Sequence, residues 1–252
     1  MSDRAAGLSE RQRQYLQALD IPVWRSRAAV DETAAESQAV AAQAAEPVAA
    51  PLGADVTAAW SQLEREVVEC TKCELYRTRT QAVFGVGNRQ ADWLIVGEAP
   101  GRDEDQQGEP FVGRAGKLLN AMLEALGYAR EDVYIANILK SRPPKNRDPK
   151  PEEVAACEPY LKQQIALLKP KIILAVGRVA AQNLLKTDTP IGKLRGQRLE
   201  YQVAAETVTK VPVVVTYHPA YLLRSPADKR KAWQDLLLAR QIYHEARSGA
   251  AA

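Results

Sequence analysis

Two short segments of the chain carry the residue types best suited to chemistry. Glu98 lies in the segment Val-Gly-Glu-Ala-Pro-Gly, and His218 lies in Tyr-His-Pro-Ala-Tyr-Leu-Leu-Arg. Each segment follows an apolar run, at 93–96 and 211–215, that is typical of a buried parallel strand. Because ligands bind at the carboxyl ends of such strands, a carboxylate and a histidine brought together there could perform acid–base or charge-stabilising chemistry.

Further strands and helices alternate between these two segments. Strands are predicted at 133–137 and 171–176, and the stretch 191–208 is interpreted as a hairpin or loop. Helices are predicted at 57–68, 114–126, 151–168, 180–185 and 228–247. The alternation predicts an α/β fold, a three-layer sandwich with a central, mostly parallel sheet flanked by helices.

Composition excludes several classes of protein. The 252 residues carry a formal net charge of +3, too mild to indicate nucleic-acid binding by itself. No apolar run approaches the roughly 20 residues of a membrane span, and the N-terminus lacks the apolar core of a signal peptide, so a cytoplasmic protein is expected. With three cysteines, a Cys-x-x-Cys among them, a metal or redox site is favoured over a disulfide set.

The chain divides into three parts by texture. Residues 1–27 hold apolar side chains among polar ones and are interpreted as an arm. Residues 28–55 are rich in Ala, Glu, Val and Gln and hold no aromatic residue, which predicts a disordered linker. Residues 56–247 are predicted to form the folded domain.

Several uncommon motifs occur together in this domain, over roughly residues 63–240. They are Gly97-Glu98-Ala99-Pro100-Gly101, Glu104-Asp105, Gly108, Pro110 to Gly116, Asn137, Lys140 to Arg147 and His218-Pro219-Ala220. In order and approximate spacing they resemble the motifs of the family 4 uracil-DNA glycosylases, which excise uracil from DNA. The resemblance implies the uracil-DNA glycosylase fold and hydrolysis of an N-glycosidic bond in base excision repair.

The resemblance implies roles for individual residues. Phe111 would stack on a flipped-out uracil, and Asn137 would pair with its N3–H and O4 edge. His218 would stabilise charge developing on O2, and Glu98 would orient or deprotonate the attacking water. Glu104 also lies near the pocket in this family, and the sequence does not rank the two carboxylates. Gly97, Ala99 and Gly101 are expected to bind the substrate through their backbone.

Contacts to DNA outside the pocket are expected from two segments. The loop 141–150 carries Arg142, Lys145, Arg147 and Lys150 and would contact phosphates. Arg224 would do the same, while Leu222 or Leu223 would wedge into the gap left by the flipped base.

Family 4 members typically hold a [4Fe–4S] cluster on four cysteines. Cys70, Cys73 and Cys157 match three of these positions, and Ser141 stands at the fourth. A hydroxyl is a harder and less acidic ligand than a thiol. Three outcomes are therefore open: a cluster with a serine or exogenous fourth ligand, a labile three-cysteine cluster, or no cluster.

The arm offers a second class of function. Its apolar residues, Tyr15, Leu16, Leu19, Ile21 and Trp24, resemble the N-terminal peptide of the psi subunit of the DNA polymerase III clamp loader, which binds the chi subunit. The other interpretation of the arm is a helix that packs on its own domain. The whole chain is thus a glycosylase, a psi-like adaptor with a vestigial pocket, or a glycosylase tethered to the replisome.

Overall fold

The computed structural model describes residues 54–203 and 210–249. The predicted partner-binding arm and nearly all of the predicted linker lie outside these ranges. The linker prediction is wrong at its end, because helix α2 already begins at Ala54, where the Asp55 carboxylate favours the first turn. Among the described helices, none has the length and apolarity that crossing a membrane requires.

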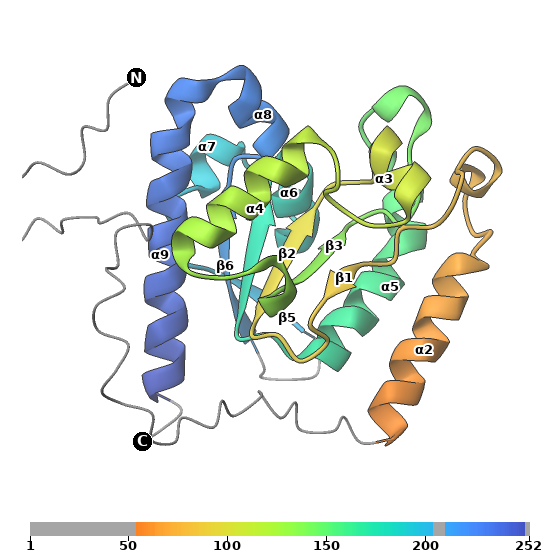
Figure 1. The fold of residues 1–252 in the computed structure, drawn as a ribbon, viewed down its shortest axis with the longest axis horizontal. Coiled ribbons are helices and arrows are strands. Elements are labelled where there is room, and N and C mark those ends of the chain that lie inside the picture. Colours follow the sequence, from red (N-terminus) through yellow and green to blue (C-terminus); the bar gives the residue numbers. More distant parts are fainter. Residues whose placement is uncertain (1–53, 204–209, 250–252) are drawn as a thin grey trace, which may run out of the picture. The chain divides into compact units, whose positions relative to one another are not determined.

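The sheet in the described domain has six strands: β1 (Val86–Gly87), β2 (Trp93–Gly97), β3 (Tyr134–Asn137), β4 (Ile172–Val176), β5 (Leu199–Gln202) and β6 (Lys210–Thr216). They lie in the order β1-β3-β2-β4-β6-β5 (Figure 1). The four inner strands run parallel, and the edge strands β1 and β5 are antiparallel to their neighbours. The predicted mostly parallel sheet is confirmed.

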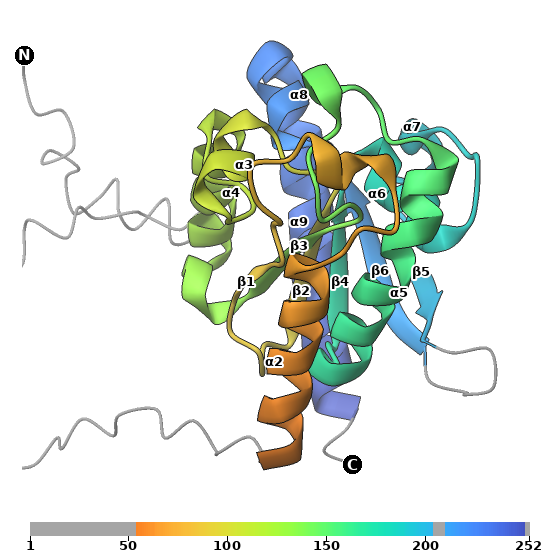
Figure 2. The same cartoon turned by 90° about the vertical axis from the view of Figure 1, so that its right-hand side faces the viewer.

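Helices cover both faces of this sheet: α2 (Ala54–Val68), α4 (Arg114–Leu126), α5 (Pro151–Leu168), α6 (Arg178–Leu185) and α9 (Lys229–Gly249). Because side chains alternate along a strand, Leu94 and Val96 of β2 join the core formed with α2, α5 and α6. Trp93 and Ile95 join the opposite core, with α4 and α9. Figures 1 and 2 show these helices on the two sides of the sheet, which confirms the three-layer fold.

Local signals explain where α4 ends and where α5 begins. Gly127 adopts the left-handed conformation (φ 90°) that suits the residue after a helix, and its N–H bonds to Leu123 and Glu124 close α4. Pro151 occupies the first turn of α5, where no N–H is needed. Both helices have the bounds that the sequence predicts.

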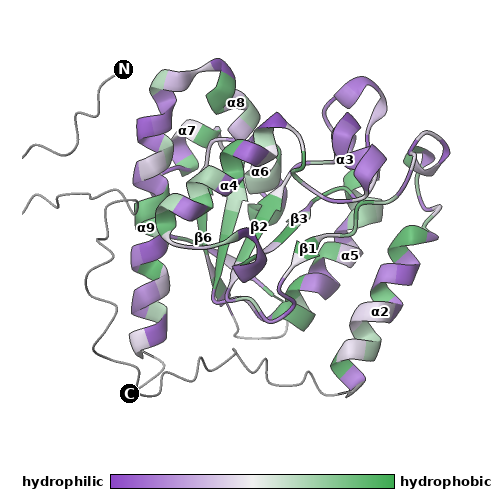
Figure 3. Cartoon of the chain, viewed as in Figure 1, coloured by the Kyte–Doolittle hydropathy of each residue, from purple (hydrophilic) through white to green (hydrophobic). Residues whose placement is uncertain are grey.

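Short elements escape the sequence analysis. Helix α3 (Arg102–Gln107) is entirely polar, and α8 (Pro219–Arg224) begins directly after His218. The stretch after Pro190 forms helix α7 (Ile191–Leu194) and then β5. Figure 3 shows the difference, because the inner strands are hydrophobic whereas α3 is hydrophilic. Apolar periodicity cannot find α3, which has no apolar residue, and α7 and α8 are too short for a helical repeat to show.

Candidate active site

A cavity of about 430 Å³ lies at the carboxyl end of the sheet. Glu98 follows β2, Asn137 ends β3, and His218 lies two residues after β6. The cavity brings together most of the residues that the sequence predicted for the site: Glu98, Ala99, Gly101, Glu104, Phe111, Asn137, His218 and Arg224. The parallel strands thus present these side chains at one edge of the sheet.

Three side chains form the inner part of this cavity. The Phe111 ring, 6% exposed, stacks with the imidazole of His218 at a centroid distance of 5.6 Å and an interplanar angle of 28°. Asn137 is 2% exposed, and its Oδ1 has no hydrogen-bond partner within the described part of the chain. Nζ of the buried Lys140 donates to the Asn137 backbone carbonyl (3.0 Å). An aromatic face and an unpaired amide oxygen therefore meet in one pocket, and a buried acceptor of this kind calls for a donor on a ligand.

Gly97 allows these groups to approach one another. A Cβ at this position would lie 2.4 Å from Asn137 Oδ1 and 2.6 Å from the Phe111 ring. A glycine at the end of β2 is therefore required by close packing of the pocket wall rather than by its backbone angles.

His218 has one ring nitrogen committed. Nδ1 accepts a hydrogen bond from the backbone N–H of Ala220 (3.1 Å) at the start of α8. Burial, and next the positive charge of Arg224, lower the pKa of His218 to about 4, while the Glu104 carboxylate opposes this shift. The imidazole is thus neutral near pH 7, and because Nδ1 accepts, its proton is on Nε2. His218 can therefore donate one hydrogen bond from Nε2.

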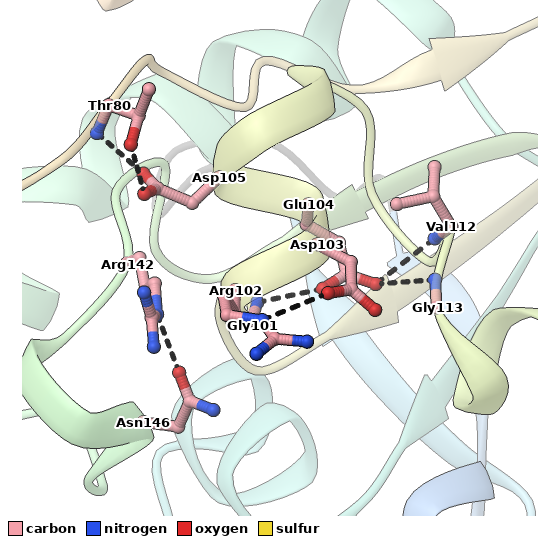
Figure 4. A network of polar contacts seen from close by, with 10 residues as sticks. All are labelled: Thr80, Gly101, Arg102, Asp103, Glu104, Asp105, Val112, Gly113, Arg142 and Asn146. Carbon is pink, nitrogen blue, oxygen red and sulfur yellow. Dashed lines mark hydrogen bonds and ion pairs between the residues drawn. The ribbon is translucent and has the colours of Figure 1, made fainter.

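The two carboxylates that the sequence left unranked differ in what they bind. The Glu104 carboxylate accepts hydrogen bonds from three backbone N–H groups, those of Gly101 (3.1 Å), Val112 (3.0 Å) and Gly113 (3.1 Å) (Figure 4). The Glu98 carboxylate accepts no hydrogen bond from another residue of the described ranges, although its backbone carbonyl accepts the N–H of Leu139. Glu104 therefore holds two loops together, whereas Glu98 remains able to bind a water or substrate.

Burial raises the pKa of Glu98. The negative charge of Asp148 adds to this effect, and Arg178 opposes it. The side chain of Arg178 forms an ion pair with Asp148 at 2.5 Å. Neither residue was singled out for the site by sequence, because their role depends on the loop before α5 reaching the start of α6.

Helix α3, which carries Glu104, is also fixed from its other side. The buried Asp105 carboxylate accepts the backbone N–H (2.9 Å) and hydroxyl (2.8 Å) of Thr80 (Figure 4). The segment that follows Cys73 is thereby attached to the helix that borders the cavity.

The basic loop is less available to DNA than its composition indicates. Arg147 binds the buried Glu153 at 2.5 Å, and Lys150 lies 3.8 Å from Glu152. Arg142 donates to the amide oxygen of Asn146 (2.7 Å) (Figure 4). Arg147 is therefore held in a structural ion pair with Glu153. Arg142 bonds a neutral amide, so its charge remains available to a ligand.

Helix α8 corrects one expectation at the mouth of the cavity. Leu222 is 1% exposed and faces α4 and α9, so it cannot wedge into DNA. Leu223 is half-buried and Arg224 is exposed. Tyr221 also lines the cavity, although the sequence assigned it no role, and its position three residues after His218 on one helix was the available signal.

The cysteines predicted as cluster ligands belong to one region of the core. Cys157 is 3% exposed and belongs to the hydrophobic core between the sheet and α2, α5 and α6, and Cys70 and Cys73 pack against this same core. Burial is the main cause that raises the pKa of Cys73 and of Cys157, and the other thiols add to it. Ser141, 4% exposed, accepts a hydrogen bond from Arg79 Nη1 (3.0 Å).

This donor set fits a cluster held by three thiolates better than one held by four ligands. The three thiols interact electrostatically. No three His, Cys, Asp or Glu side chains within the described ranges meet around a single metal ion, and a cluster of several irons does not need them to. The Ser141 hydroxyl is already engaged by a guanidinium.

Comparisons with known proteins agree with this geometry. Residues 84–237 match the uracil DNA glycosylase superfamily. The chain is 51% identical to the type-4 uracil-DNA glycosylase of Archaeoglobus fulgidus over 64% of this chain and 82% of that protein. It is 44% identical to that of Saccharolobus solfataricus (68% and 80%) and 42% identical to that of Pyrobaculum aerophilum (70% and 91%). The chain therefore belongs to the type-4 family of the uracil DNA glycosylase superfamily.

Proposed function

We propose that this protein is a uracil-DNA glycosylase, which hydrolyses the bond between uracil and deoxyribose in DNA. The observation that carries the proposal is the unpaired, buried Oδ1 of Asn137 beside the stacked rings of Phe111 and His218. A vestigial pocket in an adaptor has no need to keep a buried acceptor unpaired, since that costs free energy. The enzyme is therefore favoured over the adaptor.

Base recognition follows from these side chains. A uracil flipped out of the DNA stack would lie on the Phe111 ring. Asn137 Oδ1 would accept the N3–H of the base, and the amide nitrogen would donate to O4. Cytosine has no proton on N3 and an amino group at position 4, so it would leave both groups of Asn137 mismatched.

Bond cleavage develops opposite charges on the two fragments. The bond between C1′ and N1 breaks, its electron pair leaves with uracil, and the sugar becomes cation-like. The neutral His218 would donate from Nε2 to uracil O2, which carries the developing negative charge. This interaction strengthens as the bond breaks, so it stabilises the transition state more than the substrate.

Glu98 is assigned the role of activating the attacking water. Its carboxylate would orient a water toward C1′, accept a proton as the new C1′–O bond forms, and stabilise the cationic sugar. Glu104 is a positioning residue, because its oxygens hold the backbone of Gly101, Val112 and Gly113. The uracil anion is released after taking up a proton.

DNA outside the pocket would be bound by cations near the cavity mouth. Arg224 lines the cavity and is exposed, and Arg142 and Lys145 lie in the adjoining loop. Leu223, which is half-buried on α8, would fill the gap left by the flipped base. Affinity for DNA should accordingly fall as salt concentration rises.

Cys70, Cys73 and Cys157 are proposed to hold an iron–sulfur cluster by three thiolates, with Ser141 bound to Arg79 rather than to iron. Such a cluster would join the segment after α2 to α5, so its role is structural. The proposal that the arm binds chi is separate from the pocket, and the residues that match the superfamily begin only at residue 84.

The function is tested with oligonucleotides that contain one uracil. The full chain should release free uracil and leave an alkali-labile abasic site, with no release from the matched thymine oligonucleotide. A folded sample that releases no uracil from single-stranded or double-stranded DNA over hours would contradict the proposal and favour the adaptor.

A further inference from the structure

The loop that carries the base-stacking ring, residues 110–113, has an unusual backbone. Phe111 has a φ of 55°, in the left-handed region that residues other than glycine seldom adopt. Close packing adds to the constraint, because a Cβ at Gly116 would lie 1.8 Å from the Phe111 carbonyl oxygen. A conformation of this kind persists only where the surroundings fix it.

Two side chains of opposite charge bind the backbone of this loop. The Glu104 carboxylate accepts the N–H groups of Val112 and Gly113. The guanidinium of Arg130 donates to the carbonyls of Pro110 (2.5 Å) and Phe111 (3.4 Å). The anion thus takes the N–H groups of the loop, and the cation takes its carbonyls.

The surroundings of Arg130 hold its guanidinium against the carbonyls of this loop. Arg130 follows α4 along the chain and is half-buried. A third hydrogen bond, from its guanidinium to the amide oxygen of Asn120 (3.1 Å), fixes the orientation of the guanidinium. Burial lowers the pKa of Arg130, and the carboxylates of Glu109 and Glu104 oppose this effect. Its hydrogen-bond acceptors are neutral oxygens, so the guanidinium fixes a backbone rather than closing an ion pair.

We propose that Arg130 is a positioning residue for uracil excision, which acts by holding Phe111 in its left-handed conformation so that the ring stays stacked beside His218. Without the two carbonyl bonds, the loop can relax toward ordinary backbone angles. The ring would then leave the plane in which it meets the base. This inference rests on the proposed function and adds a residue to its machinery.

The test is a double-mutant cycle in the full chain, with Arg130→Met, Phe111→Ala and the double variant. The readouts are the single-turnover rate of uracil release and inhibition by free uracil. Arg130→Met should lower the rate by roughly 10- to 100-fold, as small displacements of substrate-positioning groups do, and should weaken inhibition by free uracil. In the Phe111→Ala background, the same change should cost less than about threefold, because residues that act as a unit are not additive.

A matched control is Arg247→Met. Arg247 is exposed and stacks on Tyr243, which packs on Trp93 at the amino end of β2, the end of the sheet opposite the cavity. This variant should release uracil at the wild-type rate. Should Arg130→Met fail to fold, Arg130→Lys retains the charge and one donor, and it should show a smaller loss with the same dependence on Phe111.

The outcomes separate the inference from the function. Equal losses in the wild-type and Phe111→Ala backgrounds would show that Arg130 acts on the fold in general, and wild-type activity of Arg130→Met would show that the carbonyl bonds are dispensable. Either result overturns the inference while uracil release by the wild type and by Arg247→Met keeps the function. No release by the wild type overturns both.

Discussion

The backbone N–H of Ala220 donates to Nδ1 of His218 at 3.1 Å, and this single bond decides which nitrogen faces the substrate. Because α8 begins at Pro219, the N–H of Ala220 lies in the first turn, where it needs an acceptor from outside the helix. The imidazole supplies that acceptor and therefore keeps its proton on Nε2. Helix formation and leaving-group stabilisation use the same side chain.

We predict that His218 stays effective well into the acid range. Its pKa of about 4 is below its ordinary value, so the neutral form, with Nδ1 accepting, persists until the pH falls to about 4. Because the unfolded chain takes up this proton first, the contribution of His218 to stability is complete above about pH 6.5 and is lost as pH falls toward 4. NMR titration of the imidazole checks the value, and a midpoint near 6.5 would contradict it.

His218→Ala should slow uracil release by about two orders of magnitude or more.

The acid limb of the rate profile should therefore belong to Glu98. Burial and Asp148 raise the pKa of Glu98, so activity should fall on acidification at a pH above the ordinary glutamate value. Asp148→Asn removes a negative neighbour and should move this limb to lower pH, while Arg178→Met should move it to higher pH. Single-turnover rates between pH 4 and 8 measure both shifts. If the acid limbs of Asp148→Asn and Arg178→Met move in the same direction, the assignment to Glu98 is contradicted.

The two carboxylates should respond differently to amide substitution. Glu98→Gln should lower the rate of uracil release by about 10²-fold or more with little change in melting temperature, because it removes a proton acceptor. Glu104→Gln should lower the melting temperature as well, because an amide group has only one acceptor oxygen for three backbone N–H groups. Kinetics and calorimetry on the same samples make the comparison. A Glu98→Gln variant of wild-type activity would remove Glu98 from the mechanism.

Gly97→Ala tests the packing of the pocket wall. The new Cβ would meet Asn137 Oδ1 and the Phe111 ring at distances that atoms do not tolerate, so both groups must move. A shift of about 1 Å can cost roughly 100-fold in rate. Gly192→Ala in α7 is the matched control, because its Cβ would meet no atom within 4 Å. Equal rates for the two variants would show that the pocket wall adapts.

Much of this site could be predicted from sequence, for reasons that particular residues make clear. Asn137 and His218 are fixed by strands whose apolar runs are readable, so their convergence follows from the order of a parallel sheet. Arg130 could not be predicted, because its role depends on carbonyls that a left-handed residue turns toward it. The burial of Leu222 likewise depends on how α8 packs against α4, which periodicity over six residues does not show.

The cysteine site gives a prediction that does not involve activity. If three thiolates hold a cluster and Ser141 is bound to Arg79, protein purified without oxygen should contain iron and absorb broadly near 400 nm. Ser141→Cys adds a soft ligand and should raise both iron content and resistance to oxygen. Ser141→Ala removes only the hydroxyl and should leave iron content unchanged. A loss of iron in Ser141→Ala would show that serine is a ligand, and a colourless wild type after reconstitution would show that the site is lost.

The arm can be tested apart from the domain because α2 begins at Ala54. Deletion of residues 1–53 leaves this helix intact and should preserve folding and uracil release. A peptide of residues 1–27 should bind chi by itself through its apolar side chains, since aromatic anchors often dominate such interfaces. Trp24→Ala in the full chain should weaken that complex by about 2 kcal/mol, the loss expected of an anchor residue in an interface. Calorimetry of chi with the full and the truncated chain gives the answer, and equal affinities would mean that the arm does not bind chi.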